Sequence, residues 1–279
     1  VSTSPGFRNV FSSTSARKGL VMGNVQSGKT QNYLGLINKA IDAGYKTIIV
    51  LGGHLNDLRK QTQERVDEGV IGEQSIHLEE ASTGPSTPIG IGNFFDNYKN
   101  SIISGTSTKK DFNKAYADQC GYKLDSGTPV IFIIKKHTTP LNLLCDWIER
   151  KHFLNPDEGI KCTQPVLLID DEADYASINT KHHKEKVTRT NGLIRKLLSL
   201  FNKSTYVGYT ATPFANIFID PDENSYGEKD DLFPSDFMIK MSVPNNYMGQ
   251  EFFFGSKALE DESNSTSPII EINDHWPVH

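Results

Sequence analysis

Length, composition and charge exclude several classes of protein for this chain. Its 279 residues suffice for one large α/β domain or two small ones, and the contents of 37 % hydrophobic and 23 % charged residues are ordinary for a soluble protein. The sequence shows no apolar run near the roughly 20 residues of a membrane span, which argues against a membrane protein, and no secretory signal. Its three cysteines lack CxxC spacing, which argues against disulfide-bonded and zinc proteins and favours the cytoplasm. With a net charge of −5, nucleic acid would have to bind at a local basic patch.

Apolar runs alternate with helical patterns along the chain, which predicts a parallel sheet with crossover helices. Gly44 stands where a helix C-terminal glycine belongs, and Thr139 and Pro140 are suited to begin a helix, with the threonine as its cap. Residues 55–69 predict a polar, exposed helix, and residues 70–128 an irregular insertion with one helix near 109–119. The other expected elements are strands near 19–22, 46–51, 130–134, 166–170 and 205–210 and helices near 29–43 and 190–202.

The first chemical motif follows the first expected strand, in the stretch GLVMGNVQSGKTQNYLGLI at 19–37. It matches G-x-x-x-x-G-K-[ST], in which glycines let the backbone N–H groups face phosphate oxygens and the next helix adds its positive end. Lys29 would reach the β- and γ-phosphates of ATP, and the Thr30 hydroxyl would ligate Mg²⁺. The alternative is an ordinary turn between strand and helix. The predicted nucleotide-binding residues are Gly23, Asn24, Val25, Gln26, Ser27, Gly28, Lys29 and Thr30.

The second motif is VLLIDDEAD at 166–174, where carboxylates follow an apolar strand. Ligands bind at this edge of open parallel sheets. We assign Asp171 to Mg²⁺ and Glu172 to the base that orients and deprotonates an attacking water, with Lys29 as the third catalytic residue. An acidic helix N-terminus is the alternative interpretation, since the helix dipole stabilises carboxylates there. The glycine-rich loop upstream favours the nucleotide site.

The third motif, YTATP at 209–213, again follows an apolar strand and by itself would be a strand that runs into a turn. In the order G-x-x-x-x-G-K-T, DEAD and TATP, the three motifs resemble the first motor domain of superfamily II helicases and translocases. The resemblance implies a RecA-like fold, α/β in class, with a mostly parallel sheet and helices on both faces. It also implies that Thr210 and Thr212, with Asp174 as their partner, couple the ATP site to the nucleic-acid site.

A longer stretch, GNVQSGKTQNYLGLINKAIDAGYKTIIVLGGHLNDLRKQTQERVDEG, resembles the Z-one domain family. Its members are bacterial superfamily II-like ATPases, often classed as endonucleases and found near restriction–modification and phage-defence genes. The resemblance covers most of residues 19–220. TATP, where DEAD-box RNA helicases have Ser-Ala-Thr, is more typical of double-strand translocases, so duplex DNA is the favoured partner. The resemblance further implies other defence-system proteins as partners.

The motifs divide the chain into a lead segment at 1–18, an ATPase motor domain at 19–220 with the insertion at about 70–128, and an extension at 221–279. In this superfamily a second motor domain supplies an arginine finger to the γ-phosphate, yet no arginine follows Arg195. We therefore expect a larger parent protein whose second motor domain completes the site. Without that arginine the chain should hydrolyse ATP weakly, because such fingers contribute ~10³–10⁵ in turnover.

A basic stretch, KHHKEKVTRTNGLIRK, occupies residues 181–196 between DEAD and TATP. Lys184, Lys186 and Arg189 are its candidate contacts to a phosphate backbone. A solvated loop and helix face is the alternative.

The sequence as a whole predicts the motor domain of an ATP-driven DNA translocase or helicase of bacterial defence. Two alternatives stay open: a nucleotide-dependent switch or scaffold that never translocates, and part of an ATP-dependent endonuclease whose nuclease residues lie outside this chain. Within the chain the one E-x-K triplet, Glu149 to Lys151, ends an expected helix without a preceding Pro-Asp pair, which argues against a nuclease centre here.

Overall fold

Parallel strand pairing organises the part of the chain that the computed structural model describes. Those residues are 15–25, 27–75, 87–94, 101–119, 122–124, 126–152, 154, 156–175, 177, 188–217 and 232–243. Within them seven strands form one sheet in the order β3-β4-β2-β5-β6-β1-β7, and each pair of neighbours is parallel. The strands are β1 (Ser15–Met22), β2 (Thr47–Leu51), β3 (Ile103–Ser104), β4 (Val130–Ile134), β5 (Val166–Asp171), β6 (Lys203–Thr210) and β7 (Phe237–Lys240).

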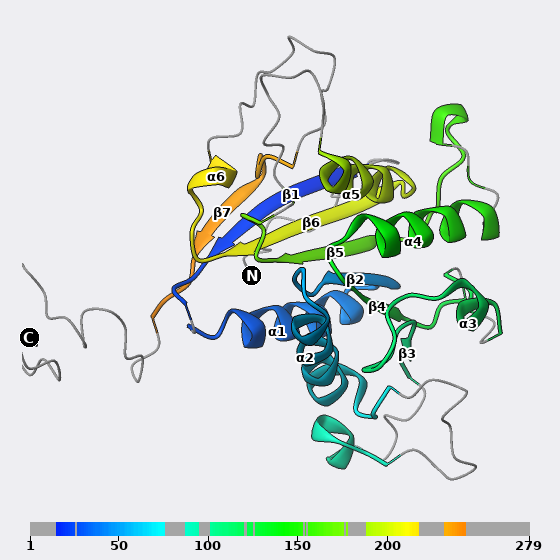
Figure 1. The fold of residues 1–279 in the computed structure, drawn as a ribbon, viewed down its shortest axis with the longest axis horizontal. Helices are drawn as coiled ribbons and strands as arrows, with labels where there is room; N and C mark the ends of the chain where they lie inside the picture. The colour runs from blue at the N-terminus through cyan, green and yellow to red at the C-terminus, as the bar shows by residue number, and fades with distance from the viewer. Residues whose placement is uncertain are drawn as a thin grey trace, which may run out of the picture.

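Helices cover both faces of this sheet (Figure 1). They are α1 (Lys29–Asp42), α2 (Asn56–Val66), α3 (Lys114–Gln119), α4 (Thr138–Lys151), α5 (Arg189–Ser199) and α6 (Phe214–Ile217). A π-helical turn, Asp67–Ile71, continues α2, and 3₁₀ turns lie at Gly90–Asn93 and Pro156–Glu158. None of the helices in the described ranges is long and apolar enough to cross a membrane.

The central strands supply two hydrophobic cores, because successive side chains on a strand point to opposite faces. In β2, Ile48 and Val50 pack with α1 and α2, whereas Ile49 and Leu51 pack with α4 and α5. All five residues of β2 and of β4 are buried, which matches their continuous apolar sequences. The α/β, RecA-like fold with a parallel sheet between two helical layers is thus confirmed.

Most element boundaries agree with those expected from sequence. The main addition is β7, which lies within the predicted extension at 221–279 and pairs with Gly19–Met22 of β1. Strand β1 itself begins at Ser15, before the expected residue 19. The domain boundaries stay predictions.

The prediction that the helix at 55–69 is exposed was wrong. Along α2, Arg59 and Gln63 are buried, and the Gln63 amide donates to the Asp67 carboxylate over 2.9 Å. Asp67 also accepts from the Ser75 N–H and hydroxyl, over 2.8 and 2.5 Å. Burial raises the pKa of Asp67 to about 6 in spite of these hydrogen bonds. The polar sequence therefore reflects a buried polar network that holds the start of the insertion.

The expected cap of α4 was also wrong. The helix begins at Thr138, its cap is His137, and the His137 Nδ1 accepts from the Thr139 N–H over 3.3 Å. Pro140 therefore lies at the third helical residue, still within the first turn, where a missing N–H leaves no intrahelical bond unmade.

Two glycines, one within α1 and one just past its end, predict opposite responses to one substitution. Gly35→Ala should raise the free energy of unfolding by about 1 kcal/mol, since glycine is a poor residue in an exposed helix interior and no atom lies within 4 Å of the added Cβ. Gly44→Ala should lower it by about 1–2 kcal/mol, because φ is +96° there. Urea unfolding of both variants measures the difference, and shifts of equal sign would contradict this account of α1.

Candidate nucleotide site

Three loops meet at the carboxyl edge of the sheet, because β6 lies between β1 and β5. Met22 at the end of β1 pairs with Thr210 of β6, and Tyr209 of β6 pairs with Asp171 of β5. The Gly23 N–H donates to the Thr210 carbonyl over 3.0 Å, which ties the glycine-rich loop to the end of β6. Segments that are far apart in sequence therefore lie side by side.

The backbone of the glycine-rich loop requires glycine at both motif positions, Gly23 and Gly28. Gly28 has φ +88°, in the left-handed region that favours glycine. At Gly23 an added Cβ would lie 2.7 Å from the Ser27 hydroxyl oxygen. Ser27 is 3 % exposed, and its hydroxyl has no hydrogen-bond partner in the described part of the chain. A buried hydroxyl of this kind fits a ligand with acceptor oxygens, such as a phosphate.

The Lys29 ammonium binds backbone oxygens of the glycine-rich loop. Its Nζ donates to the carbonyl oxygens of Gly23 and Asn24, over 3.0 and 2.9 Å. Burial lowers the pKa of the Lys29 ammonium, and the nearby charges of the DEAD carboxylates Asp171, Asp174 and Glu172 oppose that shift. The loop cation and the acidic segment thus face the same space.

Thr30, the predicted magnesium ligand, accepts a hydrogen bond from Arg65 of α2 over 2.9 Å. Sequence reasoning did not identify Arg65, which lies 35 residues away in an ordinary polar helix. Of the other loop residues, Val25 is 66 % exposed, and Gln26 lies outside the described residues.

The two assigned carboxylates have different environments. Asp171 ends β5, and burial raises the pKa of its carboxyl, with a further increase from the charge of Glu172 and a decrease from Lys136. Glu172 is exposed and has φ +54°, the one positive φ among the described non-glycine residues. Such a conformation is uncommon for a non-glycine residue, and strained conformations of this kind cluster at functional sites.

Lys136, at the carboxyl end of β4, is a buried cation that sequence reasoning missed. Its Nζ lies 2.6 Å from the Asp170 carboxylate, and both side chains are 0 % exposed. It also donates to the backbone carbonyls of Asp171, Glu172 and Tyr175, over 2.7, 2.7 and 3.2 Å. The other Asp170 oxygen accepts from the Tyr206 hydroxyl over 2.7 Å. Lys136 therefore fixes the backbone that carries the two assigned carboxylates.

Asp174 connects the DEAD segment to TATP. The Thr210 hydroxyl donates to one Asp174 oxygen over 2.7 Å, and the Thr212 hydroxyl donates to the other over 2.6 Å. The Thr212 N–H in turn donates to the Thr210 hydroxyl over 2.9 Å. The three residues predicted to couple the sites thus form one hydrogen-bonded unit.

The candidate nucleic-acid contacts are separate from this cluster. Arg189 is exposed and begins α5, whereas Lys184 and Lys186 lie outside the described residues. Their predicted role stays a prediction.

Comparisons with known proteins add little to this geometry. No family model matches the chain, and no curated protein matches it. Among solved structures, the helicase domain of Hef from Pyrococcus furiosus is similar, with 13 % identity and a TM-score of 0.44 over 82 % of this chain and 35 % of that one. The chain thus spans about a third of that structure's length. A likeness this distant carries no functional argument.

The Lys136–Asp170 pair predicts strong energetic coupling. Lys136→Met should lower the free energy of unfolding by about 3–5 kcal/mol, because it leaves a buried carboxylate and three carbonyls without their cation. Asp170→Leu should have a cost of similar size. The double variant should lose clearly less than the sum of the two, since neither charge is then left alone. Urea unfolding of all four proteins tests this, and additive losses would contradict it.

Proposed function

We propose that this chain is an ATP-binding and hydrolysing motor domain of a superfamily II-type DNA translocase or helicase. The observation that carries the proposal is the meeting of three loops at the ends of β1, β6 and β5, where Asp174 accepts from both threonines of TATP. A turn without ligand-binding function does not require a buried unpartnered hydroxyl, a lysine held over the loop and two carboxylates in one place. The resemblance to the Z-one family supports a role in bacterial restriction or phage defence.

In this proposal the backbone N–H groups of the glycine-rich loop bind the phosphates of ATP, and Lys29 leaves the carbonyls of Gly23 and Asn24 to contact the β- and γ-phosphates. Thr30 and Asp171 hold Mg²⁺, which when bound neutralises charge on the phosphates. No group of three or more His, Cys, Asp or Glu side chains that could hold a metal occurs in the described ranges. Magnesium commonly keeps waters and phosphate oxygens as ligands beside one or two protein groups.

Glu172 is the proposed general base. Its carboxylate is exposed, so water can reach it, and the carbonyl of the same residue is held by Lys136 over 2.7 Å. A carboxylate on a fixed backbone can orient a water toward the γ-phosphate and accept its proton. The proposed coupling path begins at Asp174, two residues further along, and reaches the end of β6 through Thr210 and Thr212.

ATP binding and turnover test the proposed roles in the 279-residue chain. Lys29→Ala should weaken binding of a fluorescent ATP analogue by more than about tenfold. Glu172→Gln should still bind the analogue, while turnover falls by about 10²–10⁴, as expected for loss of a general base. Lys39→Ala, on the exposed side of α1, and Glu64→Gln, on α2, are the matched controls. Unchanged binding by Lys29→Ala would mean that the loop is a turn without phosphate-binding function.

The coupling unit predicts a separate effect on stimulation by DNA. Thr212→Val keeps the side-chain shape but removes the hydroxyl that donates to Asp174 over 2.6 Å. We expect the rate with duplex DNA to fall toward the rate without DNA, while the ATP analogue still binds. Thr139→Val, at an exposed threonine of α4, is the control. If duplex DNA never stimulates the unmodified chain, a nucleotide-dependent switch becomes the better description.

A further inference from the structure

A basic groove lies at the end of the sheet opposite to the nucleotide site. Its volume is about 690 Å³, and it runs between α5 and the first half of β1. Residues Ser15–Lys18 lie at the amino end of β1, and Asn202 and Ser204 lie at the amino end of β6. Because all neighbouring strands are parallel, this end is the far edge from the loops that carry Lys29 and Asp171. The groove is therefore a second site.

Charge is concentrated in this groove. Basic side chains account for five of its lining residues, and none of the described residues that line it is acidic. They are Arg17, Lys18, Lys161, Arg195 and Lys196. The whole chain has a net charge of −5, so this concentration is local and not a consequence of overall composition.

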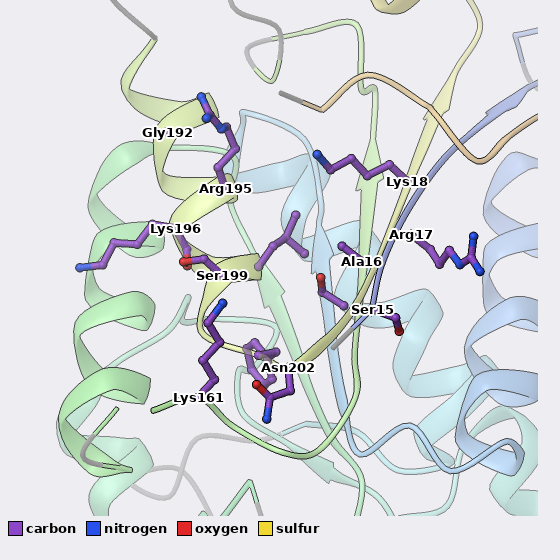
Figure 2. A pocket seen from close by; sticks show the side chains of 13 residues that line it. Ser15, Ala16, Arg17, Lys18, Lys161, Gly192, Arg195, Lys196, Ser199 and Asn202 are labelled. Atoms are coloured by element: carbon purple, nitrogen blue, oxygen red, sulfur yellow. The ribbon is translucent and has the colours of Figure 1, made fainter. Parts of the chain in front are cut away.

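The five lining cations differ in direction and in their printed partners. In the parallel register Lys18 pairs with Tyr206, whose side chain belongs to the core beneath α5, so Lys18 projects from that face. Figure 2 shows Lys18 extending from β1 toward α5, while Arg17 extends the opposite way and bonds Asp236 over 2.6 Å. Lys196 extends from the outer side of α5 and pairs with Glu149 over 2.9 Å. Lys18 therefore faces the groove from β1, and Lys161 and Arg195 also line it.

Helix α5 gives the groove its length. Gly192, Arg195 and Ser199 recur at three- and four-residue intervals and so share one helix face, and Gly192 adds no side chain that could narrow the groove. Arg189 lies three residues before Gly192 and continues the same face toward the carboxyl edge of the sheet. The basic stretch at 181–196 that the sequence singles out therefore ends in this groove.

We propose that the groove between α5 and β1 binds the phosphate backbone of a nucleic acid. Lysine and arginine provide the attraction, and hydroxyl and amide groups such as those of Ser15 and Asn202 provide the hydrogen bonds that position phosphates. An acidic peptide is less well suited. Leu198 and Phe201, the large apolar lining residues, are 8 % and 3 % exposed and offer no pocket for an apolar anchor. For its class of ligand this inference rests on the proposed function, and it adds a binding site at the opposite edge of the sheet from the nucleotide site.

DNA binding by a triple variant tests the groove. The groove variant combines Lys18→Gln, Lys161→Gln and Arg195→Gln, which removes three positive charges that line the groove. The control variant combines Lys39→Gln, Lys60→Gln and Lys123→Gln, which removes the same charge at exposed sites elsewhere. Binding of a fluorescent 20-base-pair duplex is measured by anisotropy from 50 to 200 mM salt. We expect the groove variant to bind at least tenfold more weakly at 50 mM and its salt slope to shrink by up to about 2.7, at ≈ 0.9 per lost phosphate contact. The control variant should change less than about twofold.

Three outcomes would overturn the proposal. The first is that the unmodified chain does not bind DNA. The second is that both triple variants lose affinity equally. The third is that polyglutamate of matched charge binds as tightly as DNA, with the same dependence on the three cations. If the groove variant melts early, the single variants Lys161→Gln and Arg195→Gln decide instead, each with an expected loss of about two- to fivefold. Binding of the ATP analogue is measured in parallel, so failure of the groove and failure of the nucleotide site remain distinguishable.

Discussion

The parallel pairing of β6 with β1 on one side and β5 on the other determines where the candidate chemistry lies. Parallel strands end at one edge, so each strand delivers its following loop to the same place. The register sets the neighbours: Met22 lies beside Thr210, and Tyr209 beside Asp171. Aromatic contacts reinforce the arrangement, since the Tyr209 ring meets Tyr33 of α1 at 5.5 Å and its hydroxyl donates to Asn32. The helix that follows the glycine-rich loop is thereby joined to the strand that carries TATP.

Lys136 adds a second constraint at the same edge. A fully buried ammonium is costly unless oxygen atoms surround it, and here four of them do, one from Asp170 and three from backbone carbonyls. With those carbonyls turned toward Lys136, the chain leaves β5 through Glu172 at φ +54° with its side chain exposed. A stable interaction in the interior thus holds an uncommon backbone conformation at the surface, beside the proposed water-activating carboxylate.

The features that sequence predicted are those that neighbouring residues specify. Gly28 next to Lys29, the apolar run before Asp171 and Gly44 after α1 each carry their signal within a few positions. The features it missed depend on distant contacts. Arg65 belongs to an ordinary polar helix until the fold brings it to Thr30, and Gln63 looked exposed because its buried partner Asp67 is equally polar. The sequence signal for Lys136 was a charged residue soon after an apolar strand. Its structural role depends on Asp170, which lies on a different strand of the sheet.

The contacts of Lys29 have a consequence for ligand selectivity. Without ligand, the ammonium is already bonded to the carbonyls of Gly23 and Asn24, at 3.0 and 2.9 Å. Any anion that recruits this lysine must replace both bonds, so the net gain is a difference between two satisfied states. A small monovalent anion offers too few acceptors for a favourable exchange, whereas a polyphosphate can engage the lysine and several loop N–H groups at once. If the loop binds phosphates as proposed, these two internal bonds of Lys29 would favour polyphosphates over small monovalent anions.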